Sequence, residues 1–384
     1  MNATSQNVCD TLPFLNCEAN QIIVNNPNEI DTLIQKFNNL NEAGSSSINI
    51  VHIGDSHLQA GFLTEKIKQE LFNYYCKDSI VSPGFIFPFT IAQTNNPFFY
   101  KVNYTGNWEY CKNVDYEKTC RLGLSGITVR TQDSVATFSI KMQNKKDSNN
   151  CKKYLFDQIK IFHNNDSSIA LKINGQNISL EKNISEINLT TLTDSVHFEI
   201  INSDTTSFFE LYGIILENSS SKINYHTIGV NGATAQSYLK CEYLSPQLSS
   251  INPDLVIISL GTNEAFDDHF SILEHEYVLK DLVLQIKDTA PNAAIVLVTP
   301  NDHLKRGQQN EKVLLVRKNI IKISKELHLS LWDFYTIMGG ANSINDWYNK
   351  GLTGEDKLHF KRKGYEIQGE LFTKAFIDLI EKTN

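Results

Sequence analysis

An apolar segment that stops abruptly at a glycine constrains the fold of this chain more than any other feature. Residues 48–53 have the length and β-branched composition of a buried strand, and Gly54-Asp55-Ser56 follows at once. Apolar residues then recur at helical spacing, at Leu63, Ile67 and Leu71. A strand therefore runs into a tight turn that presents one serine hydroxyl at a helix N-terminus, where free N–H groups and the helix dipole favour negative charge.

The last part of the chain alternates strand-like with helix-like patterns. Apolar runs of strand length occupy residues 224–228, 255–260, 294–299 and 330–334. Amphipathic helical patterns occupy residues 274–289, 312–327 and 364–381. Together with residues 48–53, these segments predict an α/β fold with a parallel sheet of about five strands, covered by helices on both faces.

Residues 98–220 interrupt this alternation and show no helical periodicity. Short alternating runs, separated by Asn, Asp, Ser and Gly, lie at residues 126–131, 136–142, 158–163, 169–173, 196–201 and 208–216. A strand–helix–strand unit needs only about 30 residues, so the excess here is the size of a domain. We therefore expect an inserted β-sandwich or jelly-roll domain at residues 98–220, between two parts of the α/β domain at residues 1–97 and 221–384.

Polar motifs follow three of the predicted strands directly. Ser56 follows the first strand, Gly-Val-Asn-Gly-Ala-Thr at residues 229–234 follows the second, and Gly-Thr-Asn-Glu at residues 261–264 follows the third. Ligands of parallel α/β sheets bind outside the carboxyl ends of the strands. We therefore expect Ser56, Gly232 and Asn263 to lie together at that edge.

A serine hydroxyl needs a neighbouring base before it can act as a nucleophile near neutral pH. The segment Asp-Lys-Leu-His-Phe at residues 356–360 offers one, since a short turn can hold the Asp356 carboxylate beside the His359 imidazole. Such a carboxylate fixes the tautomer of the ring and stabilises the imidazolium that forms during attack.

The order and spacing of these four motifs resemble those of the SGNH (GDSL-type) serine hydrolases. The resemblance covers about residues 45–95 and 223–384. It implies a three-layer, flavodoxin-like fold, a catalytic triad of Ser56, Asp356 and His359, and no metal or organic cofactor.

The same resemblance implies an oxyanion hole for the tetrahedral intermediate. The family supplies two backbone N–H groups, which map onto Ser56 and Gly232, and an asparagine side chain, which maps onto Asn263. Gly232 matches better than Gly229 because it directly precedes Ala-Thr. The alternative for both glycines, and above all for Gly229, is that they only serve the turn.

Gly-Asp-Ser-His at residues 54–57 and Gly-Thr-Asn-Glu-Ala at residues 261–265 are most similar to the peptidoglycan O-acetylesterase branch of that family. This likeness implies an esterase that removes O-acetyl groups from a carbohydrate, above all peptidoglycan, through an acetyl-Ser56 intermediate, with a carbohydrate-binding-like inserted domain. The alternatives are an acetylesterase acting on other polysaccharides or short-chain esters, an acyltransferase with the same triad, and a non-catalytic carbohydrate-binding protein.

Four other side chains are candidates for contact with the substrate. His303 follows residues 294–299, so it is either a substrate contact or a rival base to His359. Trp108 is either a sugar-facing residue or part of the core of the inserted domain. Phe85 and Phe87 lie in a loop rich in Pro and Gly, and we expect them to crowd the acyl site so that it accepts little more than an acetyl group.

The composition limits the partners and the location of the protein. A formal net charge of −8 argues against a nucleic-acid surface. No apolar run approaches the ~20 residues of a membrane span. No signal peptide is visible. Because the family resemblance implies an envelope substrate, we expect a periplasmic or secreted protein whose signal peptide has been removed, with a cytoplasmic location as the alternative.

The seven cysteines leave the disulfide pattern open. Cys9 and Cys17, and Cys111 and Cys120, are spaced for small disulfide loops, and the odd total leaves at least one thiol. No Cys/His cluster has the spacing of a structural zinc site.

Overall fold

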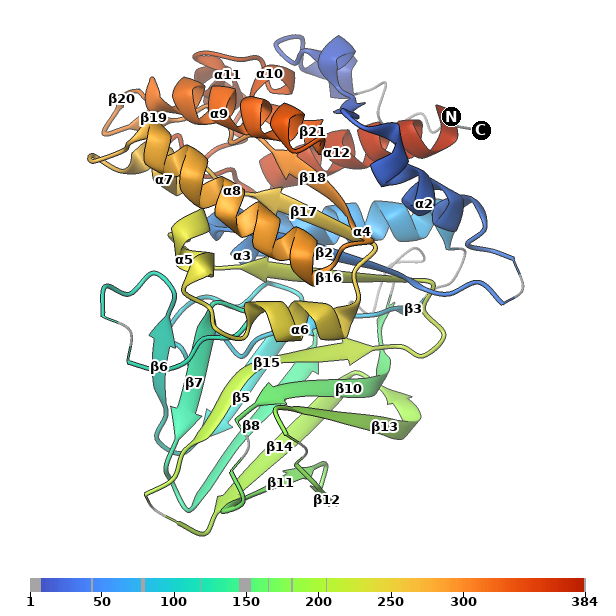
Figure 1. Cartoon of the computed structure of the whole chain (residues 1–384), viewed down its shortest axis with the longest axis vertical. Coiled ribbons are helices and arrows are strands. Elements are labelled where there is room, and N and C mark those ends of the chain that lie inside the picture. The colour runs from blue at the N-terminus through green and yellow to red at the C-terminus, as the bar shows by residue number, and fades with distance from the viewer. Residues whose placement is uncertain are drawn as a thin grey trace.

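The computed structural model describes residues 8–42, 44–76, 80–117, 119–144, 153–164, 166–180, 182–204 and 206–382. A mixed α/β half, at the top of Figure 1, contains the N-terminal and C-terminal segments of the chain. A half made of antiparallel sheets, at the bottom of the same view, contains the middle of the chain.

The sheet of the α/β half contains five parallel strands and one antiparallel edge strand. In spatial order these are β1 (Ile22–Ile23), β21 (Ser330–Trp332), β18 (Ala294–Val298), β17 (Leu255–Ser259), β2 (Ile48–Gly54) and β16 (Ile223–Gly229). Numbered along the chain, the parallel strands lie in the order 2-1-3-4-5, as in flavodoxin-like sheets. The short β1, which the sequence pattern did not indicate, pairs antiparallel with β21.

Helices cover both faces of this sheet, with α8 and α9 packed together on one face and α4 and α12 on the other (Figure 1). The helices are η1 (Cys17–Ala19), α2 (Pro27–Asn38), α3 (Ser56–Gln59), α4 (Phe62–Tyr75), α5 (Ala235–Leu239), α6 (Leu244–Ile251), α7 (Thr262–Phe266), α8 (Ile272–Thr289), α9 (Lys312–Glu326), α10 (Phe334–Ile337), α11 (Ser343–Asn349) and α12 (Arg362–Lys382). The three long helical patterns of the sequence correspond to α8, α9 and α12, each of which buries one apolar stripe.

Two larger antiparallel sheets lie between β2 and β16 in the chain. One has the order β13 (Ile184–Thr193), β10 (Phe156–His163), β15 (Phe209–Glu217), β7 (Ile127–Thr131) and β6 (Glu109–Lys112), with β4 (Gly84–Ile86) also paired to β15. The other has the order β12 (Gln176–Ile178), β11 (Ile169–Ile173), β14 (Ser195–Asn202), β8 (Val135–Met142) and β5 (Tyr100–Thr105). Two small pairs complete the strands: β3 (Ile80–Val81) with β9 (Lys153–Tyr154), and β19 (Leu304–Lys305) with β20 (Gln308–Gln309).

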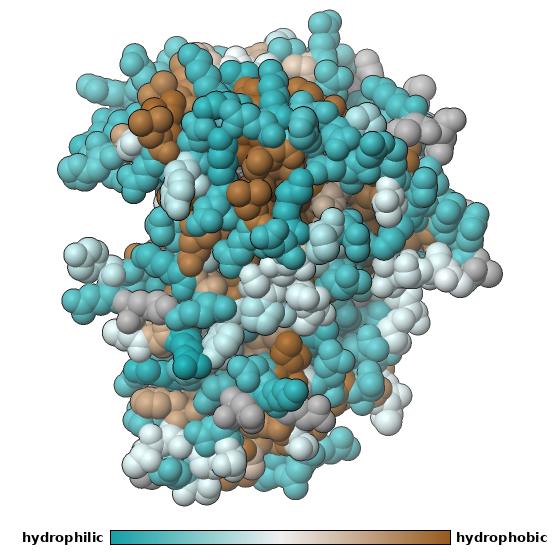
Figure 2. All heavy atoms as spheres, in the orientation of Figure 1, coloured by the Kyte–Doolittle hydropathy of each residue, from teal (hydrophilic) through white to brown (hydrophobic). Residues whose placement is uncertain are grey.

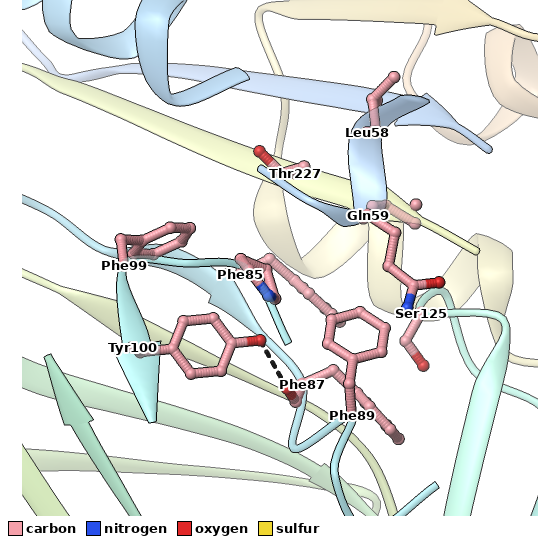
Figure 3. A pocket seen from close by; sticks show the side chains of 12 residues that line it. Leu58, Gln59, Phe85, Phe87, Phe89, Phe99, Tyr100, Ser125 and Thr227 are labelled. Atoms are coloured by element: carbon pink, nitrogen blue, oxygen red, sulfur yellow. Dashed lines mark hydrogen bonds between the residues drawn. The ribbon is translucent and has the colours of Figure 1, made fainter. Parts of the chain in front are cut away.

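Strand β4 joins the two halves of the molecule. It precedes residue 97, yet it pairs with β15, and the ring of Phe85 packs on Gly213 and on Phe162, 6.2 Å away between ring centroids. The hydroxyl of Tyr100 donates a hydrogen bond of 2.7 Å to the carbonyl oxygen of Phe87 (Figure 3). The aromatic rings in this view surround a cavity of only about 10 Å³, so the junction is closely packed.

The face seen in Figure 2 is mostly hydrophilic, with apolar atoms in the upper half of the view, where α8 and α9 lie. The exposed large apolar residues of these two helices are Ile272, Leu273, Tyr277, Leu284 and Leu315. Within the described parts of the chain, no helix combines the length and apolar character that a membrane span requires.

We expect Gly84→Ala to destabilise the protein strongly, because its Cβ would overlap the carbonyl oxygen of Tyr225 on β16. Gly175 is a matched control, since it has φ +82° against +81° for Gly84 but has no neighbour within 4 Å of an added Cβ. Urea denaturation should show a loss for Gly84→Ala that exceeds the loss for Gly175→Ala by about 1–3 kcal/mol. Equal losses would show that the close contact between β4 and β16 does not contribute to stability.

Candidate active site

Three strand ends meet at the position of the serine. Gly54 is in register with Gly229 of β16 and with Ser259 of β17, so the segments that follow all emerge at one sheet edge. Ser56 is the first residue of α3, and the side chain of Asp55 caps this helix by accepting a 2.9 Å hydrogen bond from the backbone N–H of His57. The helix expected after Ser56 is in fact two helices, because the chain takes a left-handed turn before α4.

A chain of two hydrogen bonds links the candidate triad. Ser56 Oγ lies 2.9 Å from His359 Nε2, and His359 Nδ1 lies 2.8 Å from Asp356 Oδ2. With the ring proton on Nδ1, this nitrogen donates to the carboxylate, and the lone pair on Nε2 faces the serine hydroxyl. The structure therefore brings together the three side chains named from the sequence, although Ser56 and His359 are 303 positions apart.

Asp356 is held as a carboxylate. Its Oδ1 accepts the backbone N–H groups of Leu358 and His359, each at 3.1 Å. Partial burial raises the pKa of Asp356, but hydrogen bonds from the His359 ring and from these two backbone groups outweigh that effect and lower the pKa overall. The group stays ionised near neutral pH, which is the state that can stabilise an imidazolium.

The turn that carries His359 is tied to the end of β18. The side chain of Asn301 donates a 3.1 Å hydrogen bond to the carbonyl of Leu358, and the backbone N–H of Leu304 donates a 3.0 Å bond to the carbonyl of Lys357. The sequence reasoning did not identify Asn301. Its place directly after a predicted strand was the signal that could have indicated it.

Gly232 and Gly229 differ in their surroundings. A Cβ added to Gly229 would lie 2.7 Å from the backbone nitrogen of Gln59 and 2.9 Å from the carbonyl oxygen of Asp55, so this glycine is required by close packing. Gly232 is exposed and left-handed at φ +84°, and the nearest atom to an added Cβ is Val114 Cγ1 at 3.8 Å. A ligand therefore has room to approach Gly232, whereas backbone atoms of neighbouring residues occupy the space beside Gly229.

Asn263 lies on α7, next to the loop that contains Gly232. Its Nδ2 donates a 2.9 Å hydrogen bond to the carbonyl of Ala233 and a longer one, 3.4 Å, to Asp55 Oδ2. The short bond fixes the amide in place. The long bond leaves the second N–H only weakly engaged, so a developing oxyanion could compete for it.

Gln59, which the sequence reasoning did not identify as a residue of the site, holds the loop of Gly232. Gln59 Oε1 accepts a 2.8 Å bond from the backbone N–H of Asn231, and Gln59 Nε2 donates a 2.9 Å bond to Thr94 Oγ1. The side chain of Asn231 in turn donates a 3.0 Å bond to Asn95. These bonds tie the glycine loop to α3 and to the segment before β5.

His57 packs behind the candidate base. Its ring lies 5.2 Å from the ring of His359 between centroids, and its Nδ1 lies 3.0 Å from the hydroxyl of Tyr365. The pKa of His57 lies well below its ordinary value, mainly because the ring is buried. The nearby His359 and His303 rings lower it further. A neutral ring therefore packs against His359 without adding a second positive charge.

His303 is not placed to touch a substrate. It has no exposed surface, its Nδ1 lies 3.1 Å from the carbonyl of Asn301, and its Nε2 lies 2.9 Å from the side-chain nitrogen of Asn310. Burial lowers the pKa of His303 to about 4. We therefore do not retain the expectation that His303 contacts substrate or replaces His359 as the base.

The expectation that Trp108 faces sugar does not fit its position either. Its indole N–H donates to the carbonyl of Thr105 at 2.9 Å, and its half-buried ring packs edge-on against Phe138, with 6.0 Å between centroids. Trp108 precedes β6, whereas the other end of β6 leads to the loop beside Gly232. It packs against the core, at the end of β6 remote from the site.

Phe85 and Phe87 do not crowd the acyl site as expected. Both are buried at the junction between the two halves, where Phe85 belongs to β4. The segment read as an aromatic loop pairs with β15 because the bare backbone of Gly213 leaves room for the Phe85 ring.

Two disulfides are formed, Cys9–Cys17 and Cys111–Cys120. Cys76 and Cys241 are buried thiols, and Cys151 lies outside the described residues. Across the described ranges, no group of three or more His, Cys, Asp or Glu side chains is arranged to hold a metal ion.

The Asp55 carboxyl lies beside the nucleophile and is almost fully buried. Burial is the main reason that its pKa rises from 3.8 to about 7, and the neighbouring Glu264 adds to the rise while hydrogen bonds from the backbone oppose it. The unfolded chain therefore loses this proton at a lower pH than the folded chain, and stability falls as the pH rises from about 4 to 7.

Asp55→Asn should remove this pH dependence, because the amide keeps an acceptor for the cap but does not ionise. The free energy of unfolding of the wild type should fall relative to that of the variant between pH 4 and pH 7, by about 1.4 kcal/mol for each unit of pKa shift. Chemical denaturation at a series of pH values measures the difference. Parallel curves for the two proteins would contradict the assignment of a protonated Asp55 in the folded state.

Comparisons with known proteins agree with this geometry. The model of the GDSL-like Lipase/Acylhydrolase family matches residues 212–367. A solved structure described as "Peptidoglycan O-acetylesterase in action, 5 min" is similar to this chain with a TM-score of 0.78 and 21% sequence identity, covering 94% of this chain and 99% of that one. No curated protein matches the sequence.

Two other solved structures are similar to this chain only at TM-scores below 0.5. The protein YXIM from Bacillus subtilis has a TM-score of 0.35 and 14% identity, covering 72% of this chain and 90% of that one. A catalytic mutant of Axe2, an acetylxylan esterase from Geobacillus stearothermophilus, has a TM-score of 0.34 and 21% identity, covering 40% of this chain and 72% of that one. The match of residues 212–367 to this family and the shared fold support an SGNH-type carboxylic ester hydrolase that resembles the peptidoglycan O-acetylesterase branch.

Proposed function

We propose that this hydrolase is a serine esterase that removes O-acetyl groups from a carbohydrate, with O-acetylated peptidoglycan as its substrate. The observation that carries the proposal is the chain of hydrogen bonds from Ser56 through His359 to Asp356, at 2.9 and 2.8 Å. Proton transfer along the first bond turns the serine hydroxyl into a nucleophile as it attacks.

The reaction then proceeds in two steps. Ser56 Oγ attacks the acetyl carbonyl carbon while His359 Nε2 takes the hydroxyl proton, and the tetrahedral intermediate collapses as His359 returns that proton to the departing sugar oxygen. Water attacks acetyl-Ser56 with His359 again acting as the base, and acetate leaves as Ser56 recovers its proton. Both Ser56 and His359 are partly exposed, so water can reach the intermediate. This access favours hydrolysis over transfer to a second sugar.

The negative charge of each tetrahedral intermediate requires donors at a fixed position. The backbone N–H groups of Ser56 and Gly232 and the side chain of Asn263 are the proposed donors, each worth a few kcal/mol of barrier. The open surroundings of Gly232 support this role, since an ester group can approach its backbone N–H. The weak 3.4 Å bond from Asn263 to Asp55 supports the role of the asparagine.

The choice of carbohydrate rests on the fold and on the inserted region. The similar solved structure is described as a peptidoglycan O-acetylesterase, and the likeness extends over both halves of this chain. We propose that residues 98–220, with their antiparallel sheets, form a carbohydrate-binding-like β-sandwich domain inserted into a hydrolase domain made of residues 1–97 and 221–384. The two disulfides support a periplasmic or secreted location, because disulfides persist in oxidising compartments.

We expect Ser56→Ala, His359→Ala and Asp356→Asn each to lower kcat for an aryl acetate by roughly 100-fold or more, with little change in the melting temperature. His197→Ala is a control, because this exposed histidine lies on β14 of the other half. Full turnover by Ser56→Ala would show that another group is the nucleophile.

The substrate is tested separately, by acetate release. The wild type should release acetate from O-acetylated peptidoglycan faster than from acetylated xylan, and the Ser56→Ala variant should release none from either. Release from xylan alone would overturn the peptidoglycan assignment and leave the esterase chemistry intact.

A further inference from the structure

A short loop of the inserted region lies against the glycine of the proposed oxyanion hole. Residues 112–117, called the Tyr116 loop below, start at the last residue of β6 and lie between the two cysteines of the Cys111–Cys120 disulfide. Asp115 closes the start of the loop, since its Oδ2 accepts a 2.7 Å bond from the backbone N–H of Lys112 and its own N–H donates a 3.1 Å bond to the Lys112 carbonyl. The loop is therefore held in a defined shape at its base.

Two contacts place this loop beside the site. Val114 Cγ1 lies 3.8 Å from the position that a Cβ of Gly232 would occupy. Lys240, at the end of α5, donates a 3.3 Å hydrogen bond from its ammonium to the carbonyl of Asp115. Figure 1 shows the chain after β6 rising beside α5, the helix that follows the Gly232 loop. The loop thus forms one side of the approach to Gly232.

Tyr116 projects from this loop into solvent. Tyr116 is 99% exposed, the largest value among the exposed large hydrophobic residues of the described chain, whereas Tyr104 on the same half is 43% exposed. Tyr116 is two residues from Val114, a backbone distance of at most about 7 Å. The backbone of Tyr116 therefore lies near the side of the site that Val114 lines.

An exposed aromatic face at this place suits one kind of ligand. A pyranose ring presents a face of C–H groups, and the electron-rich face of a tyrosine attracts such groups while both surfaces leave water. The phenolic hydroxyl can in addition exchange hydrogen bonds with sugar hydroxyls. The acetyl group of a glycan enters at Ser56, so the sugars attached to it must pass over the rim of the site.

We propose that Tyr116 is a stacking platform for a sugar ring of the glycan chain whose acetyl group is bound at Ser56. The proposal rests on the function proposed above and adds a glycan subsite outside the groups that react. Tyr116 selects polymer over small esters, because an aryl acetate has no sugar that could reach the platform.

The test compares Tyr116→Ala with Tyr116→Phe, which keeps the ring, and with Tyr104→Ala, which removes an exposed tyrosine from β5 of the other sheet. Each full-length variant is assayed on O-acetylated peptidoglycan and on 4-nitrophenyl acetate. Tyr116→Ala should lower kcat/KM on the polymer about 3- to 10-fold more than on the aryl ester, mainly through KM. The other two variants should keep the wild-type ratio between the substrates.

Binding gives an independent readout. In the Ser56→Ala background, sedimentation with insoluble O-acetylated peptidoglycan should carry down less protein once Tyr116→Ala is added. An unchanged substrate ratio with unchanged sedimentation would overturn the subsite, and so would an equal loss of activity on both substrates. If the wild type cleaves the aryl ester but neither cleaves nor binds peptidoglycan, the proposed substrate and the subsite both fail, while the esterase chemistry remains.

Discussion

The site depends on how closely α3 packs onto the ends of β2 and β16. A Cβ at Gly54 would meet the Leu58 side chain at 2.7 Å and the carbonyl of Ser259 at 2.9 Å, and Gly229 is equally confined by the backbone of α3. Because no side chain fits between these elements, the first turn of α3 lies directly on the strand ends. This packing sets Ser56 at the sheet edge and fixes the positions to which every other group of the site must come.

The remaining groups reach that edge from distant parts of the chain. β16 follows the antiparallel sheets in the chain, yet it pairs with β2 over seven residues and brings the Gly232 loop to the serine. The turn of His359 is held by Asn301 at the end of β18. The antiparallel half packs against the α/β half through β4, which contains Phe85, and its Tyr116 loop lies beside Gly232. The candidate active site and the Tyr116 loop are therefore positioned by the packing of the two halves of the molecule against each other.

Local patterns were sufficient to predict the parts of the fold that bury one regular face. The parallel strands and α8, α9 and α12 lie within a few residues of their predicted ranges, because their apolar residues recur with strand or helix periods. β13 was missed because it lies at a sheet edge and only one of its ten residues is buried. The burial of His303 could not be predicted, and the sequence left Trp108 open between a sugar-facing place and the core, because sequence position indicates the sheet edge or domain but not side-chain burial. The roles of Gln59 and Asn301 depend on partners far away in sequence.

In the proposed reaction, Ser56 carries the acetyl group between the sugar and water. The most direct measurement is mass spectrometry of protein that has been mixed with an acetyl ester and quenched in acid during turnover. We predict a mass increase of one acetyl group on the peptide that contains Ser56, and none in the Ser56→Ala variant. An acetyl group found on a different residue, while the ester is being hydrolysed, would contradict the account.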